Sequence, residues 1–306
     1  PDTMEIANSV MNDTQKQRFE DKGEVDMSFA IAGEGRYRVN VYKQRGSAAL
    51  AFRLVDTVVP SPEVLGVPAS VIDLYQKKRG LILVTGPTGS GKSTTLAAII
   101  DKINNNREAH VITLEDPIEY LHQHKQAIVN QREIGLDTQS YANALRAALR
   151  EDPDVILVGE MRDFETISVA ITAAETGHLV ISTLHTIGAA STVDRVIDVF
   201  PPHQQQQIRV QLANVLEAVV SQQLVPMIGG KGRVAAFEVL HTNSAVRNLI
   251  REGKTHQITS VMQTNRKVGM MTMDDALCQL YKEYKIDREM VLQFAQEPET
   301  MKNKLF

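Results

Sequence analysis

The residues best placed to do chemistry form one glycine-rich run, Gly86 to Ser93 (GPTGSGKS), which fills every fixed position of the pattern G-x-x-x-x-G-K-[ST]. The run follows an apolar segment, residues 81–85, and opens a helical pattern, so its backbone N–H groups can wrap phosphates at a helix N-terminus. Lys92 is expected to reach the β and γ phosphates, and the Ser93 hydroxyl to bind Mg²⁺. The residues expected to bind the nucleotide are Gly86, Thr88, Gly89, Ser90, Gly91, Lys92, Ser93 and Thr94. A glycine-rich turn without ligand is the alternative, and the complete match argues against it.

A second buried strand is predicted over residues 154–158, and Glu160 follows it. Hydrolysis needs a carboxylate or amide that orients the attacking water. Asp154 begins this strand, about 20 Å from its other end, whereas parallel sheets build their sites at the carboxyl ends of their strands. We therefore expect Glu160 to be the water-polarising base, with an ion pair to Arg162 as the structural alternative.

Acidic residues also follow a third predicted strand, residues 110–114, in the run Glu115-Asp116-Pro117-Ile118-Glu119. Acids after a buried strand suit metal-bound water and phosphate chemistry, and Glu115 is the best candidate because it comes directly after the strand. A solvated cluster of charges is the alternative.

Two histidines bracket a further predicted strand, with His178 at its beginning and His185 just after its end. No cysteine or further histidine falls at metal-ligand spacing, so we reject a zinc site. The neutral imidazole of His185, at the carboxyl end of the strand, could donate a hydrogen bond to a γ-phosphate. A satisfied core histidine is the alternative.

The composition bounds the kind of protein that carries these residues. The chain has 306 residues, a net charge of −4 and 43% hydrophobic residues, which indicates about two ordered domains. Its single cysteine, Cys278, excludes an internal disulfide and an all-cysteine zinc site. No apolar stretch reaches the ~20 residues of a membrane-spanning helix. The chain begins with Pro1 and has no signal-peptide pattern, and we interpret this beginning as a cut end.

The pattern along the chain predicts three segments. Residues 1–57 predict a small α+β unit with a helix over 4–19 and a meander of strands over 26–32, 36–43 and 48–55, broken by Gly33, Gly35 and Gly46. Prolines predict a linker over residues 58–79. Residues 80–306 alternate short strands with amphipathic helices, which predicts an α/β fold with a parallel sheet and right-handed crossovers. The helices expected there cover residues 92–104, 141–150, 163–176, 187–199 and 204–223, followed by a hairpin near Gly229 and further helices from about residue 240.

Several motifs, taken in order, resemble one family. They are Ala144 to Asp154 (ALRAALREDPD), Val158 to Asp163 (VGEMRD), Ala173 to His178 (AAETGH) and Thr183 to Thr186 (TLHT). Together they resemble, over about residues 30–300, the secretion-type ATPases of type IV pilus and type II secretion machines. The run Ala245 to Glu252 (AVRNLIRE) resembles the C-terminal signature of the pilus retraction members, with Val246 in place of the usual Ile. Extension and secretion members typically carry a four-cysteine zinc insert, which this chain cannot have.

The resemblance implies a RecA-like P-loop ATPase core and a smaller PAS-like N-terminal lobe that begins upstream of Pro1. It implies a homohexamer in which each ATP site lies between the two lobes and receives arginines from the small lobe, a role that we carry over to Arg38 and Arg53. Ordinary strand-surface charge is the alternative for both, because sequence does not show which face of a strand is buried. The resemblance also implies an Asp-rich box at Glu115 to Glu119, a Walker B-like strand ending at Glu160 and a His box at His178 and His185.

We therefore expect a Mg²⁺-dependent, hexameric ATPase that drives type IV pilus disassembly from the cytoplasmic face of the inner membrane. Its expected partners are the pilus base and an inner-membrane platform protein, with only peripheral membrane contact. An extension or secretion ATPase is the alternative within the family, and a small-molecule kinase is a remoter one because it would need an acceptor pocket and a lid. A nucleic-acid translocase is disfavoured, because the net charge of −4 and 5% aromatic residues supply neither a basic stripe nor a stacking platform.

A helix is also predicted over Ala245 to Glu252, with an apolar face formed by Ala245, Val246, Leu249 and Ile250. The arginines of this segment, Arg247 and Arg251, are expected on a charged flank. Such a helix can either close the large lobe or contact the motor's partner. If it contacts the partner, reversing both arginines to Glu is expected to leave the protein folded and ATP-binding but to abolish retraction.

Overall fold

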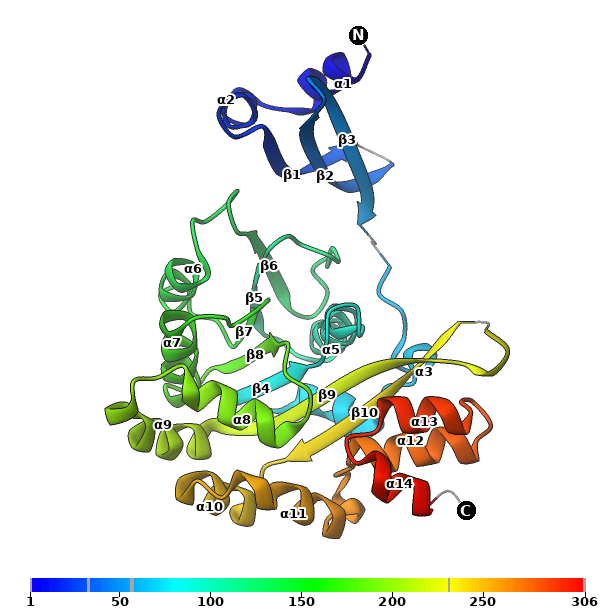
Figure 1. Cartoon of the computed structure of the whole chain (residues 1–306). Coiled ribbons are helices and arrows are strands. Elements are labelled where there is room, and N and C mark those ends of the chain that lie inside the picture. Colours follow the sequence, from blue (N-terminus) through cyan, green and yellow to red (C-terminus); the bar gives the residue numbers. More distant parts are fainter. Residues whose placement is uncertain (1, 32–33, 56–57, 231, 305–306) are drawn as a thin grey trace. The chain divides into compact units, whose positions relative to one another are not determined.

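The structure is a computed structural model that describes residues 2–31, 34–55, 58–230 and 232–304 (Figure 1). The chain divides into two compact units. The first comprises Pro1–Val59 with Pro117–His122, and the second comprises Pro60–Asp116 with Gln123–Phe306. The predicted strand end at Ala32, the predicted break at Gly33 and the lobe boundary at Thr57 lie outside the described residues.

The described residues of the first unit form two helices and a three-stranded antiparallel sheet of order β1-β2-β3, which confirms the predicted meander. Its elements are α1 (Asp2–Val10), α2 (Asp13–Lys22), β1 (Glu24–Ile31), β2 (Gly35–Gln44) and β3 (Ser47–Val55). The single helix predicted over residues 4–19 is wrong, because Asn12 starts a second helix. The Asn12 side chain accepts the Gln15 N–H, and the Gln15 side chain accepts the Asn12 N–H. Both helices pack on one face of the sheet through a core that includes Ala7, Phe19 and Val39.

The segment predicted as a linker, residues 58–79, contains short helices. They are α3 (Pro62–Leu65), α4 (Ala69–Ile72) and the 3₁₀ helix η1 (Asp73–Gln76). Pro62 stands at the first helical position after the cap residue Ser61, where a missing N–H costs nothing. The prolines of this segment therefore start helices as well as interrupt them.

The second unit is built on a seven-stranded sheet of order β10-β9-β4-β8-β7-β5-β6. Its strands are β4 (Gly80–Thr85), β5 (His110–Glu115), β6 (Ile128–Glu133), β7 (Val155–Val158), β8 (Leu179–Leu184), β9 (Leu216–Pro226) and β10 (Arg233–His241). All neighbours pair in parallel except β9 and β10. Every residue of β4, β7 and β8 is buried, as expected for a sheet covered on both faces. The predicted α/β class with a parallel sheet is therefore confirmed.

Helices cover the sheet and complete the chain. Beside the sheet they are α5 (Lys92–Asn106), α6 (Tyr141–Ala148), α7 (Phe164–Glu175), α8 (Ala189–Asp198) and α9 (Pro202–Val215). The C-terminal region contains α10 (Ser244–Glu252), α11 (Ile258–Thr264), α12 (Met273–Lys282), α13 (Arg288–Phe294) and α14 (Pro298–Lys304). One core joins α6 to α9 with β4, and a second core joins α12 to α14 with the β9–β10 hairpin. Within the described ranges, no helix has both the length and the apolar character needed to cross a bilayer.

Two elements of the second unit differ from the sequence analysis. The helix predicted over residues 204–223 ends at Val215, and the rest of that segment belongs to β9, where it is buried between β4 and β10. The sequence pattern also missed β6, an edge strand whose polar residues Asn130, Gln131 and Arg132 carry no strand signal. Both errors arise because pairing with a neighbouring strand overrides local preference.

The AVRNLIRE segment forms α10 and packs against α9. Val246 and Ile250 are buried as predicted, whereas Ala245 is exposed and does not belong to the apolar face. Arg247 also differs from the prediction. Its Nη1 donates to the carbonyls of Ala213 and Asn214 at the end of α9, and its Nη2 donates to Glu217 at 3.0 Å. Replacing Arg247 with Glu would therefore damage the fold. The double substitution of Arg247 and Arg251 thus does not distinguish a loss of stability from a loss of retraction.

Candidate active site

Four parallel strands bring the predicted chemistry to one edge of the sheet. The strands β4, β8, β7 and β5 are consecutive neighbours, so their carboxyl ends share this edge. The glycine-rich loop follows β4, His185 follows β8, Glu160 comes two residues after β7, and Glu115 ends β5. The register agrees, because Val158 of β7 pairs with Leu114 on one side and Ser182 on the other.

The loop after β4 needs its glycines. Gly86 has a φ of +138°, and a Cβ there would lie 2.2 Å from the carbonyl oxygen of Gln222 in β9. Gly91, the residue before α5, has a φ of +89°, and a Cβ there would lie 2.8 Å from the Gln222 Nε2. The Gln222 Oε1 also accepts the hydroxyl of Thr95 at 2.7 Å. Gln222 therefore packs closely against both glycines of the loop, and sequence reasoning missed it because β9 was taken for a helix.

The polar groups of this loop fit a phosphate chain. Lys92 is buried, and its Nζ donates to the carbonyls of Gly86 at 2.8 Å and Pro87 at 3.0 Å. The Ser90 hydroxyl is also buried and has no hydrogen-bond partner among the residues that the structure describes. Ser93 and Thr94 lie in the first turn of α5 and are partly exposed. A cation, an unsatisfied hydroxyl and a helix N-terminus at one place are what an anionic ligand requires.

Glu160 lies in a compact group of charges. Its Oε1 accepts a hydrogen bond from Arg162 Nε at 2.5 Å and one from His185 Nε2 at 2.8 Å, so His185 carries its proton on Nε2. Burial alone would raise the pKa of Glu160, but the hydrogen bond from Arg162 and the neighbouring His185 imidazole outweigh it and lower that pKa. The ion pair that we considered as the alternative for Glu160 is therefore present, and it keeps the carboxylate ionised.

Tyr141, the first residue of α6, was missed by sequence reasoning. Burial and the nearby carboxylates of Asp116, Glu160 and Glu115 raise the pKa of its hydroxyl. A Cβ on Gly159 would lie 2.9 Å from the Tyr141 hydroxyl oxygen, so the glycine of the VGE motif makes room for the tyrosine. No sequence pattern signals this contact, because the two residues belong to separate elements.

Glu115 is held by its neighbours in the sheet. Its Oε1 accepts the Thr113 hydroxyl at 2.6 Å and the Gln131 amide of β6 at 3.1 Å. The missed strand β6 thus positions a predicted site residue.

His178 lies at the amino ends of the parallel strands, opposite the carboxyl ends where the site lies. It directly precedes β8, as Asp154 directly precedes the neighbouring strand β7. The His178 Nδ1 is 3.0 Å from the carbonyl oxygen of Ala173, and the His178 carbonyl accepts the Gly80 N–H. Within one chain His178 does not join the group formed by the loop, Glu160 and His185, because a strand separates the two histidines.

Arg38 and Arg53 of the first unit are direct cross-strand partners, so their side chains leave the same face of the sheet. Val39 and Val41 face α1 and α2, and the alternation of side chains along β2 therefore directs Arg38 to the opposite face. Arg38 and Arg53 therefore lie on the face of the sheet opposite the one that α1 and α2 cover.

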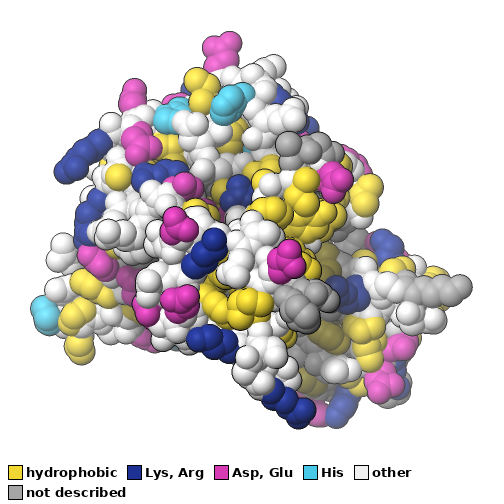
Figure 2. Space-filling model, turned by 90° about the horizontal axis from the view of Figure 1, so that it is seen from above, with side chains coloured by type: hydrophobic (Ala, Val, Ile, Leu, Met, Phe, Trp, Pro, Cys, Tyr) yellow, Lys and Arg dark blue, Asp and Glu magenta, His cyan; other side chains and the backbone are white. Residues whose placement is uncertain are grey.

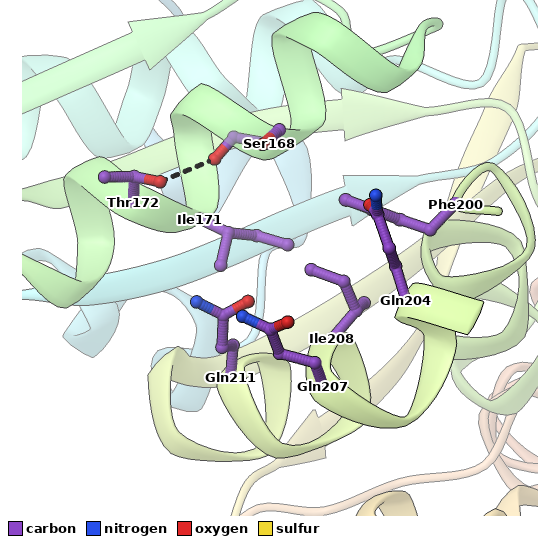
Figure 3. A pocket seen from close by; sticks show the side chains of 8 residues that line it. All are labelled: Ser168, Ile171, Thr172, Phe200, Gln204, Gln207, Ile208 and Gln211. Atoms are coloured by element: carbon purple, nitrogen blue, oxygen red, sulfur yellow. Dashed lines mark hydrogen bonds between the residues drawn. The ribbon is translucent and has the colours of Figure 1, made fainter. Parts of the chain in front are cut away.

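Other parts of the surface offer less chemistry. No group of three or more His, Cys, Asp or Glu side chains in the described ranges is arranged to hold a metal ion. On the face seen in Figure 2, Lys and Arg side chains are interspersed with Asp and Glu. A cavity of about 190 Å³ lies between α7 and α9 (Figure 3). It is lined by Ser168, Ile171, Thr172, Phe200, Gln204, Gln207, Ile208 and Gln211. These side chains are neutral, and none belongs to the site at the sheet edge.

Comparison with known proteins identifies clear relatives. The model of the family described as "Type II/IV secretion system protein" matches residues 67–292. The chain is 52% identical over 296 residues to a twitching motility protein of Neisseria gonorrhoeae, covering 97% of this chain and 79% of that protein. It is 50% identical over 290 residues to a protein of Pseudomonas aeruginosa described as the type IV pilus retraction ATPase PilT, covering 95% of this chain and 84% of that protein. A crystal structure of the pilus retraction motor PilT with bound ADP matches with a TM-score of 0.94 and 52% identity, covering 99% of this chain and 86% of that one.

Proposed function

Because the chain belongs to the type II/IV secretion system protein family, we propose that it is an ATP hydrolase, and that as a homohexameric motor it powers retraction of type IV pili. The sequence identity of 52% to a twitching motility protein and of 50% to a retraction ATPase supports this function over pilus extension or secretion. The observation that carries the chemistry is the meeting of the Lys92 loop and Glu160 at one edge of the sheet.

Each residue of the site has a proposed task. The loop N–H groups and Lys92 hold the phosphates of ATP, and Ser93 would hold Mg²⁺, which supplies positive charge to the phosphate oxygens when bound. Glu160 accepts a hydrogen bond from a water and orients it toward the γ-phosphorus, and the products are ADP and inorganic phosphate. His185 and Arg162 keep Glu160 ionised and fixed. Arg38 and Arg53 of a neighbouring subunit offset the negative charge that develops, a role that rests on family resemblance.

The same proposal places the protein at the cytoplasmic face of the inner membrane, where ATP is available. Its partners there are the pilus base and the platform protein, and its membrane contact is peripheral. The interspersed charges on the face seen in Figure 2 give no support to a nucleic-acid partner.

Two substitutions test the enzymatic part. Glu160→Gln should bind ATP nearly as well as the parent and hydrolyse it about 100-fold more slowly or worse, because the glutamine loses the negative charge that orients water. Lys92→Ala should lose both binding and hydrolysis. Phosphate release is measured with neither DNA nor an acceptor molecule present, and the particle mass is measured with and without ATP. Parental turnover in Glu160→Gln would disprove the assignment of the base, and a monomeric, acceptor-dependent enzyme would indicate a kinase.

Direction of work is tested in cells. The gene should restore twitching to a piliated strain that lacks its retraction ATPase, and the Lys92→Ala form should not. Restoration of pili to a strain that lacks its extension ATPase would instead support the alternative within the family.

A further inference from the structure

Glu238, in the middle of β10, is a carboxylate buried in the second unit, with 3% of its surface exposed. Its Oε1 accepts the Ala189 N–H at 2.6 Å. Its Oε2 accepts the Met273 N–H at 3.0 Å and the Gln296 side-chain amide at 3.0 Å. Burial raises the pKa of this carboxyl, and the three donors oppose that rise by favouring the charged form. One side chain therefore joins three segments that are far apart in the sequence.

The Oε1 side of Glu238 holds the loop that begins directly after His185. Ala189 is the first residue of α8, and the preceding Gly188 donates its N–H to the Ser221 hydroxyl at 3.0 Å. Ser221 is the cross-strand partner of Glu238 in β9, and of Thr85 in β4 on its other side. A polar row across three strands thus fixes this loop, and the row ends on the residue before the phosphate-binding loop.

The Oε2 side of Glu238 holds the C-terminal helices. Met273 is the first residue of α12, and Gln296 lies just after α13. The backbone N–H of Gln296 donates to the Asp274 carboxylate of α12 at 2.7 Å. The contact extends to the loop itself, because a Cβ on Gly188, whose φ is +93°, would lie 3.1 Å from the Gln296 Nε2. The loop backbone therefore lies close to the Gln296 side chain, and the positive φ of Gly188 favours glycine at this position.

We propose that Glu238 is a positioning residue that couples the C-terminal helices to the His185–Glu160 pair. The two oxygens of its carboxylate are a fixed distance apart. One accepts a hydrogen bond from the first residue of α12, and the other accepts one from the first residue of α8. A partner that shifts α12 or the segment at Gln296 would therefore move the loop after His185 and change the rate of hydrolysis without contacting the nucleotide. The inference rests on the proposed ATPase function and names a route by which load on the motor reaches that site.

The variant Glu238→Gln tests the coupling with almost no change in volume. An amide can accept on one side only, so one end of the bridge loses its bond whichever way the amide is turned. We expect kcat to fall about tenfold, because small misplacements of catalytic groups are costly, while KM for ATP stays within about twofold. Hydrogen exchange at the amides of residues 186–189 should become faster.

Asn243→Ala is the control. Asn243 caps α10 by accepting the Val246 N–H at 2.9 Å, and α10 is not one of the three segments that Glu238 joins. This variant should lose thermal stability, as Glu238→Gln does, yet keep the parental kcat and the parental exchange at residues 186–189. In a double-mutant cycle, adding Glu238→Gln to His185→Ala should lower kcat no further.

The outcomes separate this coupling from the function on which it rests. Parental kcat and parental exchange in Glu238→Gln would overturn the coupling, and so would equal losses of kcat in Glu238→Gln and Asn243→Ala. Additive losses in the cycle would overturn the route through His185. If the parent chain hydrolyses no ATP but the exchange changes as expected, the proposed function fails and the structural coupling stands.

Discussion

Replacing Arg247 with alanine should destabilise the second unit, because this arginine fastens α10 to the end of α9. The guanidinium donates to the carbonyls of Ala213 and Asn214 and to the carboxylate of Glu217, and only 23% of the side chain is exposed. The carbonyls lie at the last turn of α9, where the helix dipole also favours a cation.

The size of the effect follows from these contacts. Hydrogen bonds to a charged group contribute about 1.5–3 kcal/mol each when they are buried, but the three acceptors can regain part of that from water. We expect Arg247→Ala to lower the free energy of unfolding by about 2 kcal/mol. Arg247→Glu should lower it by about 3 kcal/mol, because the new carboxylate lies beside Glu217 and the two carbonyls. For a unit of this size, 2 kcal/mol corresponds to a Tm lower by about 4–8 °C.

Thermal and urea unfolding measure this loss, with Arg251→Ala as the control. Arg251 is on the same helix, but among the described residues its side chain makes a single hydrogen bond, to the Asn214 side chain at 2.9 Å, so its removal should cost about 0.5 kcal/mol or less. A Tm for Arg247→Ala within 1 °C of the parent, or equal losses for the two arginines, would refute the reasoning. Because Arg251→Glu should keep the fold, it is the variant that tests whether the charged flank of α10 contacts the partner, by comparing ATPase rate with pilus retraction.

Three further predictions concern the site. Arg53→Ala should lower turnover, and mixing it with Glu160→Gln should restore some activity, since in the proposed hexamer one interface takes its arginine and its base from different chains; no recovery between exchanging subunits would place the whole site in one chain. In His185→Ala the acidic limb of the pH–rate profile should move to higher pH, because His185 helps to lower the pKa of Glu160 against the opposing effect of burial. In the absence of His185, Glu160 is protonated at a higher pH, so hydrolysis is lost at a higher pH as the solution is made more acidic. An acidic limb that stays in place would contradict this role of His185. Gly86→Ala should abolish binding of a fluorescent ATP analogue, because its Cβ would lie 2.2 Å from a backbone carbonyl oxygen of β9, whereas Gly89→Ala meets nothing within 4 Å and should cost only about 1–2 kcal/mol of backbone strain. Equal binding by the two alanine variants would show that space at the loop is not what requires glycine.

The sequence predicted the parts of the site that depend on spacing within one segment. The loop from Gly86 to Ser93 and the position of Glu160 after a strand follow from local patterns, and the structure places both as expected. Placing Glu160 on the same edge as the loop needed only the rule that parallel strands end together.

The parts that sequence did not predict depend on contacts between segments. Gln222 reaches the phosphate-binding loop only because β9 pairs with β4, and a local pattern that continued the preceding helix concealed that strand. Tyr141 meets Gly159 from another element, and Glu115 is held by Gln131 of an edge strand with a polar sequence. The face of β2 that carries Arg38 depended on where α1 and α2 pack, which alternation alone does not decide.

The dependence of the loop on Gln222 has a consequence for how the protein is made. Synthesis completes the phosphate-binding motif at Ser93, but the carbonyl against which Gly86 packs belongs to a strand that is made much later. Pairing of β4 with β9 closes a long loop of chain, and such distant contacts form slowly during folding. The contacts of Gln222 with the loop and with Thr95 therefore form only after β9 has been made, and ATP stabilises the folded chain over the unfolded one. We expect a chain truncated before β9 to carry the intact motif and to bind ATP more weakly than the parent.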